Sequence, residues 1–178
     1  MLIAKKLLFL NLLLPIFGIL LLLVLPKKEE ELLKQVALVT SFLSLFFSIL
    51  LWGVFNKTKA GFQFVYQTFW WFNLNINFTL GVDGISILFL LLNTLLIPLC
   101  LLASWNTVKS NVKEFLIAFL FLNFLLIGTF CSLDLLFFYI FFESILIPMY
   151  LVVGIWGYKK KKILAAYYFF IYTLFGSA

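Results

Sequence analysis

The sequence predicts an all-α protein: a polytopic transmembrane bundle of six apolar helices in a single domain. Of its 178 residues, 65% are hydrophobic and only 11% are charged, whereas an average soluble domain is about 25% charged. The apolar residues also gather into six runs, each close to the ~20 residues that a spanning helix needs. This composition excludes an ordinary soluble domain, a disordered chain and a nucleic-acid binder. The six runs are 7–25, 36–55, 85–103, 115–131, 133–154 and 163–178.

The flanks of the runs support this assignment. The first run follows Lys5 and Lys6, is too long for a signal peptide and is interpreted as a retained helix. Tryptophans at or just beyond the ends of the second, third and fifth runs fit the interfacial aromatic belt: Trp52, Trp105 and Trp156. The sixth run ends without a flanking charge, so we expect that the chain is a fragment or that another polypeptide continues the structure.

The segment 56–80, between the second and third runs, is too aromatic for a loop in free solvent. Phe62, Phe64 and Tyr66 alternate with period two, and further aromatic residues follow. Alternation of this kind indicates extended chain. We expect the segment to lie on the bundle or in the lipid head-group layer.

The lysines predict the orientation in the membrane, because basic loops remain on the inner side. All 13 basic residues are lysines, and the net charge is +6. Nine fall on one side of the predicted membrane: Lys27, Lys28, Lys34, Lys109, Lys113, Lys159, Lys160, Lys161 and Lys162. Four fall on the other: Lys5, Lys6, Lys57 and Lys59. The N-terminus is therefore expected outside and the Lys159–Lys162 loop inside, where it could also bind anionic lipid head groups.

Glu143 is the strongest candidate for a functional residue, because it is the one carboxylate in the middle of an apolar run. A charge at that depth costs at least ~2.5–3.5 kcal/mol, so such residues usually belong to ion pathways or ion pairs. Pro148 has no N–H to bond the carbonyl of Ser144, which is thereby freed beside the acid. We interpret Glu143 as a proton relay; the alternative is a structural glutamate paired with a lysine of another helix. No lysine of this chain lies mid-run, so a buried cationic partner must come from elsewhere.

Two acidic residues are expected to start helices. Asp134 begins the fifth run, where it can interact with the helix dipole, with Ser132 as the cap. Asp83 precedes the third run in a glycine-rich turn, where Asp83 or Ser86 could cap the helix.

Polar residues and prolines also occur within the runs. Asn11 and Asn123 are expected to form hydrogen bonds between helices. Asn93 and Pro98 in the third run, and Pro15 in the first, indicate kinks with freed carbonyls, with water access as an alternative.

The sequence shows no motif for a cofactor or a metal. It contains no histidine and only two cysteines, Cys100 and Cys131, which lie at the ends of different runs. This pattern indicates neither a zinc site nor a disulfide framework. No nucleotide-binding glycine loop, nucleophile elbow or cysteine cluster is present, so the chain has no visible means of binding NADH, flavin, haem or an iron–sulfur cluster.

Several motifs are similar to those of the mitochondrial NADH dehydrogenase subunit 4 family. The first group comprises Leu80-Gly81-Val82-Asp83-Gly84-Ile85-Ser86, Ile97-Pro98 and Ala103-Ser104-Trp105. The second is Phe138-Tyr139-Ile140-Phe141-Phe142-Glu143-Ser144-Ile145-Leu146-Ile147-Pro148-Met149. The third comprises Gly154-Ile155-Trp156-Gly157, Ala165-Ala166-Tyr167-Tyr168-Phe169-Phe170 and Tyr172-Thr173-Leu174-Phe175-Gly176-Ser177. These matches run in order from residue 80 onwards, whereas 1–79 fit only in helix count and loop position.

The resemblance implies a proton-pumping, antiporter-like subunit of respiratory complex I in the mitochondrial inner membrane. It implies a fourteen-helix fold with two inverted repeats, of which this chain covers roughly the first third. In that family Glu143 would be the glutamate of the proton channel. NADH, flavin, iron–sulfur clusters and quinone would belong to other subunits of NADH:ubiquinone oxidoreductase. Expected partners are other membrane-arm subunits, a second polypeptide with the remaining helices, and membrane lipids. Two alternatives remain: a truncated scaffold subunit that pumps nothing alone, and a cation/proton antiporter subunit.

Overall fold

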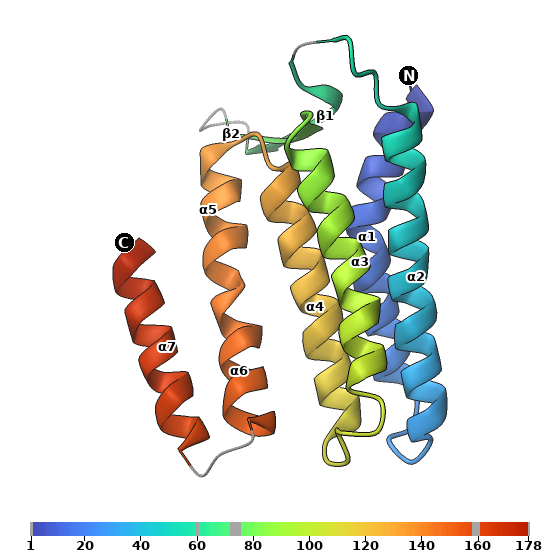
Figure 1. Cartoon of the computed structure of the whole chain (residues 1–178). Coiled ribbons are helices and arrows are strands. Elements are labelled where there is room, and N and C mark those ends of the chain that lie inside the picture. Colours follow the sequence, from blue (N-terminus) through green and yellow to red (C-terminus); the bar gives the residue numbers. More distant parts are fainter. Residues whose placement is uncertain (1, 60, 72–75, 158–160, 178) are drawn as a thin grey trace.

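The computed structural model describes residues 2–59, 61–71, 76–157 and 161–177. These form seven helices and one two-stranded sheet (Figure 1). The helices are α1 Leu2–Val24, α2 Glu30–Val54, α3 Ser86–Ala103, α4 Val112–Cys131, α5 Leu135–Ser144, α6 Leu146–Trp156 and α7 Lys162–Ser177. The strands are β1 Gln63–Trp71 and β2 Ile76–Val82. Five segments are long and apolar enough to cross a membrane, with α5 and α6 counted together as one.

The structure confirms the all-α membrane bundle and modifies its details. α1 and α2 each begin several residues before the predicted runs. The early start of α2 includes Glu30 and Glu31 in its first turn, where acidic side chains interact favourably with the helix dipole. α1 and α3 continue through Pro15 and Pro98 without interruption. The fifth run is instead divided into two helices at Ile145.

The aromatic segment forms an antiparallel hairpin at one end of the bundle (Figure 1). The alternation predicted extended chain, and that is confirmed, but the pairing of two strands was not predicted. A bulge between Gln63 and Tyr66 interrupts the alternation, and Phe64 within it has a positive φ of 57°. The hairpin rests on the helices, since Phe64 is buried and Tyr66 stacks on Phe9 of α1 with ring centroids 4.9 Å apart.

Helices α1 to α4 form a four-helix block with its core in three layers. The apolar cluster near the hairpin contains Leu8, Leu12, Leu51, Phe64, Leu80, Val82, Ile87, Leu90, Ile127 and Cys131. The apolar cluster at the opposite end contains Leu22, Leu33, Ala37, Ile97, Leu101, Val112, Phe115, Leu116 and Leu120. Buried polar side chains from all four helices occupy the positions between these clusters.

Helices α5 to α7 lie to one side of the four-helix block (Figure 1). α5 packs on α4 through Phe137 and Phe141, which join Leu125 in a third apolar cluster. The close approach depends on Gly128 of α4, because a Cβ there would lie 2.7 Å from the Phe141 ring. α7 packs mainly on α6.

Candidate functional site

The break between α5 and α6 positions Glu143 one residue before the end of α5. Pro148 supplies no N–H for the Ser144 carbonyl, and Ser144 is the last residue of α5. The Ser144 hydroxyl also donates back to the Ile140 carbonyl at 2.6 Å, a contact that bends helices. The break therefore occurs where the sequence predicted a freed carbonyl, directly beside the carboxylate.

The Glu143 side chain is half-buried and has a hydroxyl partner on α7. The Ser177 Oγ of α7 donates to its Oε1 at 2.5 Å. Tyr139 lies one turn earlier on α5, so its side chain is a neighbour of Glu143 on the helix surface. Ser177 joins α5 to α7 across the membrane-spanning region, a contact that sequence reasoning did not find.

No cation of the described residues pairs with Glu143. The ion pairs in this part of the chain join Lys27 to Glu114 and Lys34 to Glu31, and both lie at the lysine-rich end of the bundle.

Asp134 is the N-cap of α5, and its carboxylate accepts a hydrogen bond from the Leu136 N–H at 2.9 Å. The prediction that Ser132 caps this helix was wrong. Ser132 is instead the C-cap that follows α4. Its N–H donates to the Gly128 carbonyl at 2.9 Å, and its hydroxyl donates to the Asp134 carbonyl at 3.2 Å. The connection between α4 and α5 is short, so both Ser132 and Asp134 lie near the first turn of α5. The Asp134 carboxylate caps this helix because a carboxylate accepts hydrogen bonds from the free N–H groups more strongly than a hydroxyl does.

An open cavity of about 750 Å³ lies along the first half of α5. It extends from Asp134, at the hairpin end, to Tyr139 and Ile140. Asp134 and Tyr139 are its polar lining residues; the others are Leu135, Leu136, Phe138 and Ile140.

A second polar site lies in the middle layer of the four-helix block. The Asn11 Nδ2 donates to the Ser48 Oγ at 2.8 Å, and its Oδ1 accepts from the Ser44 Oγ at 3.1 Å. The Asn93 Nδ2 donates to the Asn123 Oδ1 at 3.0 Å, and the Asn123 Nδ2 reaches the Ser44 Oγ at 3.4 Å. We call these five residues the amide–hydroxyl cluster.

The amide–hydroxyl cluster confirms the predicted interhelical roles of Asn11 and Asn123. It gives Asn93 a partner on another helix, where the sequence indicated a kink. Ser44 and Ser48 were not predicted, although their spacing of four residues on α2 would have signalled a polar stripe. All five side chains are uncharged and buried, so the cluster is suited to holding helices together.

In the turn before α3, Asp83 and Ser86 contact each other as the predicted cap requires, while Ile85 occupies the N-cap position. The Ser86 N–H donates to the Asp83 Oδ1 at 2.6 Å, and the Asp83 N–H donates to the Ser86 Oγ at 2.8 Å. This reciprocal pair holds the pKa of the Asp83 carboxyl below its ordinary value, chiefly because the backbone N–H and hydroxyl of Ser86 both donate to it.

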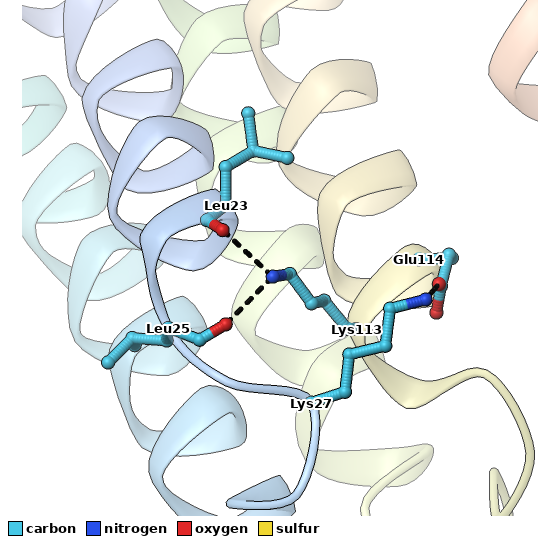
Figure 2. Close-up of polar contacts among 5 residues, drawn as sticks. All are labelled: Leu23, Leu25, Lys27, Lys113 and Glu114. Carbon is cyan, nitrogen blue, oxygen red and sulfur yellow. Dashed lines mark hydrogen bonds and ion pairs between the residues drawn. The ribbon is translucent and has the colours of Figure 1, made fainter.

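The lysine-rich end of the bundle is held together by contacts between α1 and α4. The Lys113 Nζ donates to the carbonyls of Leu23 at 2.9 Å and Leu25 at 2.8 Å, at the C-terminus of α1 (Figure 2). Lys27, just beyond α1, forms an ion pair with Glu114 (Figure 2). A cation at a helix C-terminus satisfies free carbonyls and interacts favourably with the dipole.

The lysine-bearing connections α1–α2 and α3–α4 lie at the same end of the bundle as the C-terminus of α6 and the N-terminus of α7, opposite the hairpin (Figure 1). Lys159 and Lys160 are outside the described residues. Of the two cysteines, Cys131 is buried in the apolar cluster near the hairpin and Cys100 is exposed on α3. Among the described residues, no group of three or more His, Cys, Asp or Glu side chains could hold a metal ion.

Comparison with known proteins finds a matching protein family for each of two consecutive parts of the chain. Residues 9–132 match the family described as NADH-ubiquinone oxidoreductase chain 4, amino terminus. Residues 132–178 match the family described as NADH:quinone oxidoreductase/Mrp antiporter, TM. The boundary falls at Ser132, the C-cap of α4, so the four-helix block with its hairpin corresponds to the first family and α5 to α7 to the second.

Individual relatives agree with these matches. The chain is 52% identical to NADH-ubiquinone oxidoreductase chain 4 of Chondrus crispus over 164 residues, and 48% identical to that of Arabidopsis thaliana over 163. Each alignment covers 92% of this chain and 33% of the relative, so the chain spans about a third of the length of these proteins.

Solved structures show the same arrangement of helices. A chain of respiratory complex I from Thermus thermophilus with bound NADH superposes with a TM-score of 0.77 at 32% identity, covering 96% of this chain and 33% of that one. A chain of the membrane-bound sulfane sulfur reductase, an archaeal respiratory membrane complex, shares the fold with a TM-score of 0.69 at 19% identity, covering 94% and 25%. The chain belongs to the NADH-ubiquinone oxidoreductase chain 4 family.

Proposed function

We propose that this chain takes part in proton translocation in the membrane arm of NADH:ubiquinone oxidoreductase, with Glu143 as a proton-relay carboxylate. The observation that carries the proposal is the position of Glu143: a half-buried carboxylate beside a helix break, with the Ser177 hydroxyl of α7 as its partner. Buried ionisable groups within membrane spans are rare and typically mark ion pathways.

In this role Glu143 accepts a proton on its carboxylate and later releases it. Ser177 holds Oε1 from the α7 side and thereby orients the acid. The break at Ile145 leaves the neighbouring Ser144 carbonyl able to bind a water molecule. A buried cation that pairs with Glu143 would come from outside the described residues.

The redox chemistry belongs to other subunits in this proposal. NADH, flavin, iron–sulfur clusters and quinone are bound there, and electron transfer drives the proton step in this chain. Its partners are the other membrane-arm subunits, with a second polypeptide that carries the remaining helices as one form of the assembly. Lipids cover the exposed apolar faces of the helices.

The proposed location is the mitochondrial inner membrane, with several crossings. The gathering of lysine-bearing connections at one end supports an N-terminus on the intermembrane side and a Lys159–Lys162 loop on the matrix side. Mitoplasts expose only the intermembrane face, so protease should spare this loop until the membrane is opened. Cleavage of the Lys159–Lys162 loop in intact mitoplasts would show that the orientation is the opposite of the one proposed.

The proposal is tested with Glu143→Gln, which keeps the size and hydrogen-bonding capacity of the side chain but removes its titratable proton. The matched control is Glu30→Gln, an exposed carboxylate at the start of α2. We expect the Glu143 variant to assemble at normal abundance and to lose quinone reduction and proton uptake together. One acid–base group typically contributes about 10²–10⁴-fold.

Two other outcomes would select another function. A scarce Glu143→Gln complex that works normally once assembled would show a scaffold subunit whose glutamate is half of an ion pair, because a buried partner left unpaired costs about 3–5 kcal/mol. Cation-dependent proton exchange without NADH would indicate an antiporter. If the Glu143→Gln complex assembles normally and pumps protons at the full rate, Glu143 has no part in proton translocation.

A further inference from the structure

The Ser177 hydroxyl of α7 lies within hydrogen-bonding distance of two acceptors. Its Oγ is 2.5 Å from the Glu143 Oε1 and 3.2 Å from the carbonyl oxygen of Leu174, three residues earlier on the same helix. A serine hydroxyl carries one proton, so it donates fully to only one of these acceptors at a time. Its oxygen can also accept a hydrogen bond. Ser177 therefore has two alternative bonding arrangements with its heavy atoms in one place.

The groups that adjoin Glu143 on α5 do not offer this choice. The hydroxyl of the next residue, Ser144, donates to a carbonyl of its own helix at 2.6 Å. On the side toward α4, α5 presents the buried rings of Phe137 and Phe141. The Glu143 carboxylate receives its hydrogen bond from a different helix, through Ser177.

Packing between α6 and α7 sets the position of Ser177. Ala166 is buried against Gly154 of α6, where a Cβ would lie 3.6 Å from the Ala166 Cβ. Tyr150 of α6 packs edge-on against Phe170 of α7, with ring centroids 5.7 Å apart. Both contacts lie in the first half of α7, and Ser177 is the last residue of the helix. The hydroxyl is thus carried to the carboxylate by a packed helix.

We propose that Ser177 is a positioning residue that supplies Glu143 with a partner in both of its protonation states. While Glu143 is ionised, the Ser177 hydroxyl donates to its Oε1. When Glu143 holds a proton, the O–H of the acid donates to the Ser177 Oγ, and the Ser177 hydroxyl turns to the Leu174 carbonyl. Ser177 itself neither gains nor loses a proton. The inference rests on the proposed relay role of Glu143 and adds how the relay stays in place while its charge changes.

The chemistry of the carboxyl group explains why a hydroxyl suits this position. An ionised carboxylate only accepts hydrogen bonds, whereas a protonated carboxyl also donates one. A lysine or a backbone N–H has no acceptor and would match the ionised form alone, but a hydroxyl can both donate and accept. Within a membrane span a polar group without a partner is costly. A partner that serves both forms therefore removes this cost at each step of the cycle.

The test is Ser177→Ala in the assembled complex, with Ser177→Thr as the variant that keeps the hydroxyl. The matched control is Thr173→Val, one turn earlier on α7, because the Thr173 hydroxyl donates to the carbonyls of Phe169 at 2.6 Å and Phe170 at 3.1 Å. The readouts are the abundance of the complex, proton uptake per assembled complex during NADH oxidation, and the C=O stretching frequency of protonated Glu143. That frequency is assigned as the infrared band that disappears in Glu143→Gln.

We expect Ser177→Ala to assemble normally and to slow proton uptake by about tenfold, the lower end of the factor that a hydrogen bond to a charged group contributes. The C=O frequency should shift, because the O–H of the acid loses its acceptor. Ser177→Thr should restore the rate and the frequency, and Thr173→Val should change neither.

A normal rate per complex in Ser177→Ala, where Glu143→Gln is inactive, would overturn the inference. So would a slow rate with an unshifted frequency, since packing alone would then explain the loss. An active Glu143→Gln would instead overturn the relay itself.

Discussion

Replacing Asn123 with leucine should destabilise the four-helix block through the amide–hydroxyl cluster. The change keeps the approximate volume but removes the contacts to Asn93 at 3.0 Å and Ser44 at 3.4 Å. Interhelical hydrogen bonds in membranes average about 0.6 kcal/mol, so the two contacts give about 1.2 kcal/mol. The buried Asn93 amide left unpaired adds about 1–3 kcal/mol. The expected loss is therefore about 2–4 kcal/mol in the free energy of unfolding.

The assay is denaturant unfolding of the detergent-solubilised chain, followed by tryptophan fluorescence. A double-mutant cycle with Asn93→Leu separates the pair from the background, since removing both amides leaves neither unpaired. We expect the double variant to lose less stability than the sum of the single variants, by about 1 kcal/mol. Thr94→Val is the control, because the Thr94 hydroxyl bonds only carbonyls of its own helix, Leu90 and Leu91. If the stability losses of the two single variants add up to that of the double variant within about 0.3 kcal/mol, the two amides are not coupled.

Three further changes test other contacts. Gly128→Ala should displace the Phe141 ring and lower the free energy of unfolding by about 1–3 kcal/mol, as measured by denaturant unfolding. An unchanged free energy of unfolding would show that α5 does not pack closely on Gly128. The Asp83–Ser86 cap should stabilise the fold above pH 3.8, the ordinary pKa of the carboxyl, and this stabilisation should disappear as the pH falls through the lower folded value. Asp83→Asn should remove that acid-side loss in a pH series of unfolding midpoints; an unchanged pH dependence would contradict the assignment. Lys113→Met should lower the free energy of unfolding by about 1 kcal/mol and speed hydrogen exchange of the backbone amides at the C-terminus of α1. Unchanged exchange rates would show that the contacts of Lys113 with the α1 carbonyls contribute nothing to stability.

Much of this architecture is predictable because burial in a bilayer leaves a strong signal in sequence. Apolar runs place the spans, and a lone mid-run carboxylate such as Glu143 is conspicuous because its insertion is costly. The freed Ser144 carbonyl was predictable from Pro148, but the division of the fifth run into two helices was not, since α1 and α3 continue through Pro15 and Pro98. Local chemistry of this kind depends on residues only a few positions apart.

The features that were missed depend on distant residues. Ser177 reaches Glu143 only because α7 packs beside α6, and the contact spans 34 residues of sequence. The hairpin pairs strands whose register includes a bulge, so simple alternation indicated extended chain without a partner. Ser132 and Asp134 are two residues apart, and only the three-dimensional turn determines which of them caps which helix.

The layered core of α1 to α4 has a mechanical consequence. Sliding or rotating any of these four helices would separate buried amides from their partners while it moved two apolar layers out of register. We therefore expect the four helices of the block to move as one rigid unit. If Glu143 is a proton relay, we expect the accompanying movements at the α5–α6 break and in α7, because α5 packs on the block through the apolar rings of Phe137 and Phe141 and α7 packs mainly on α6.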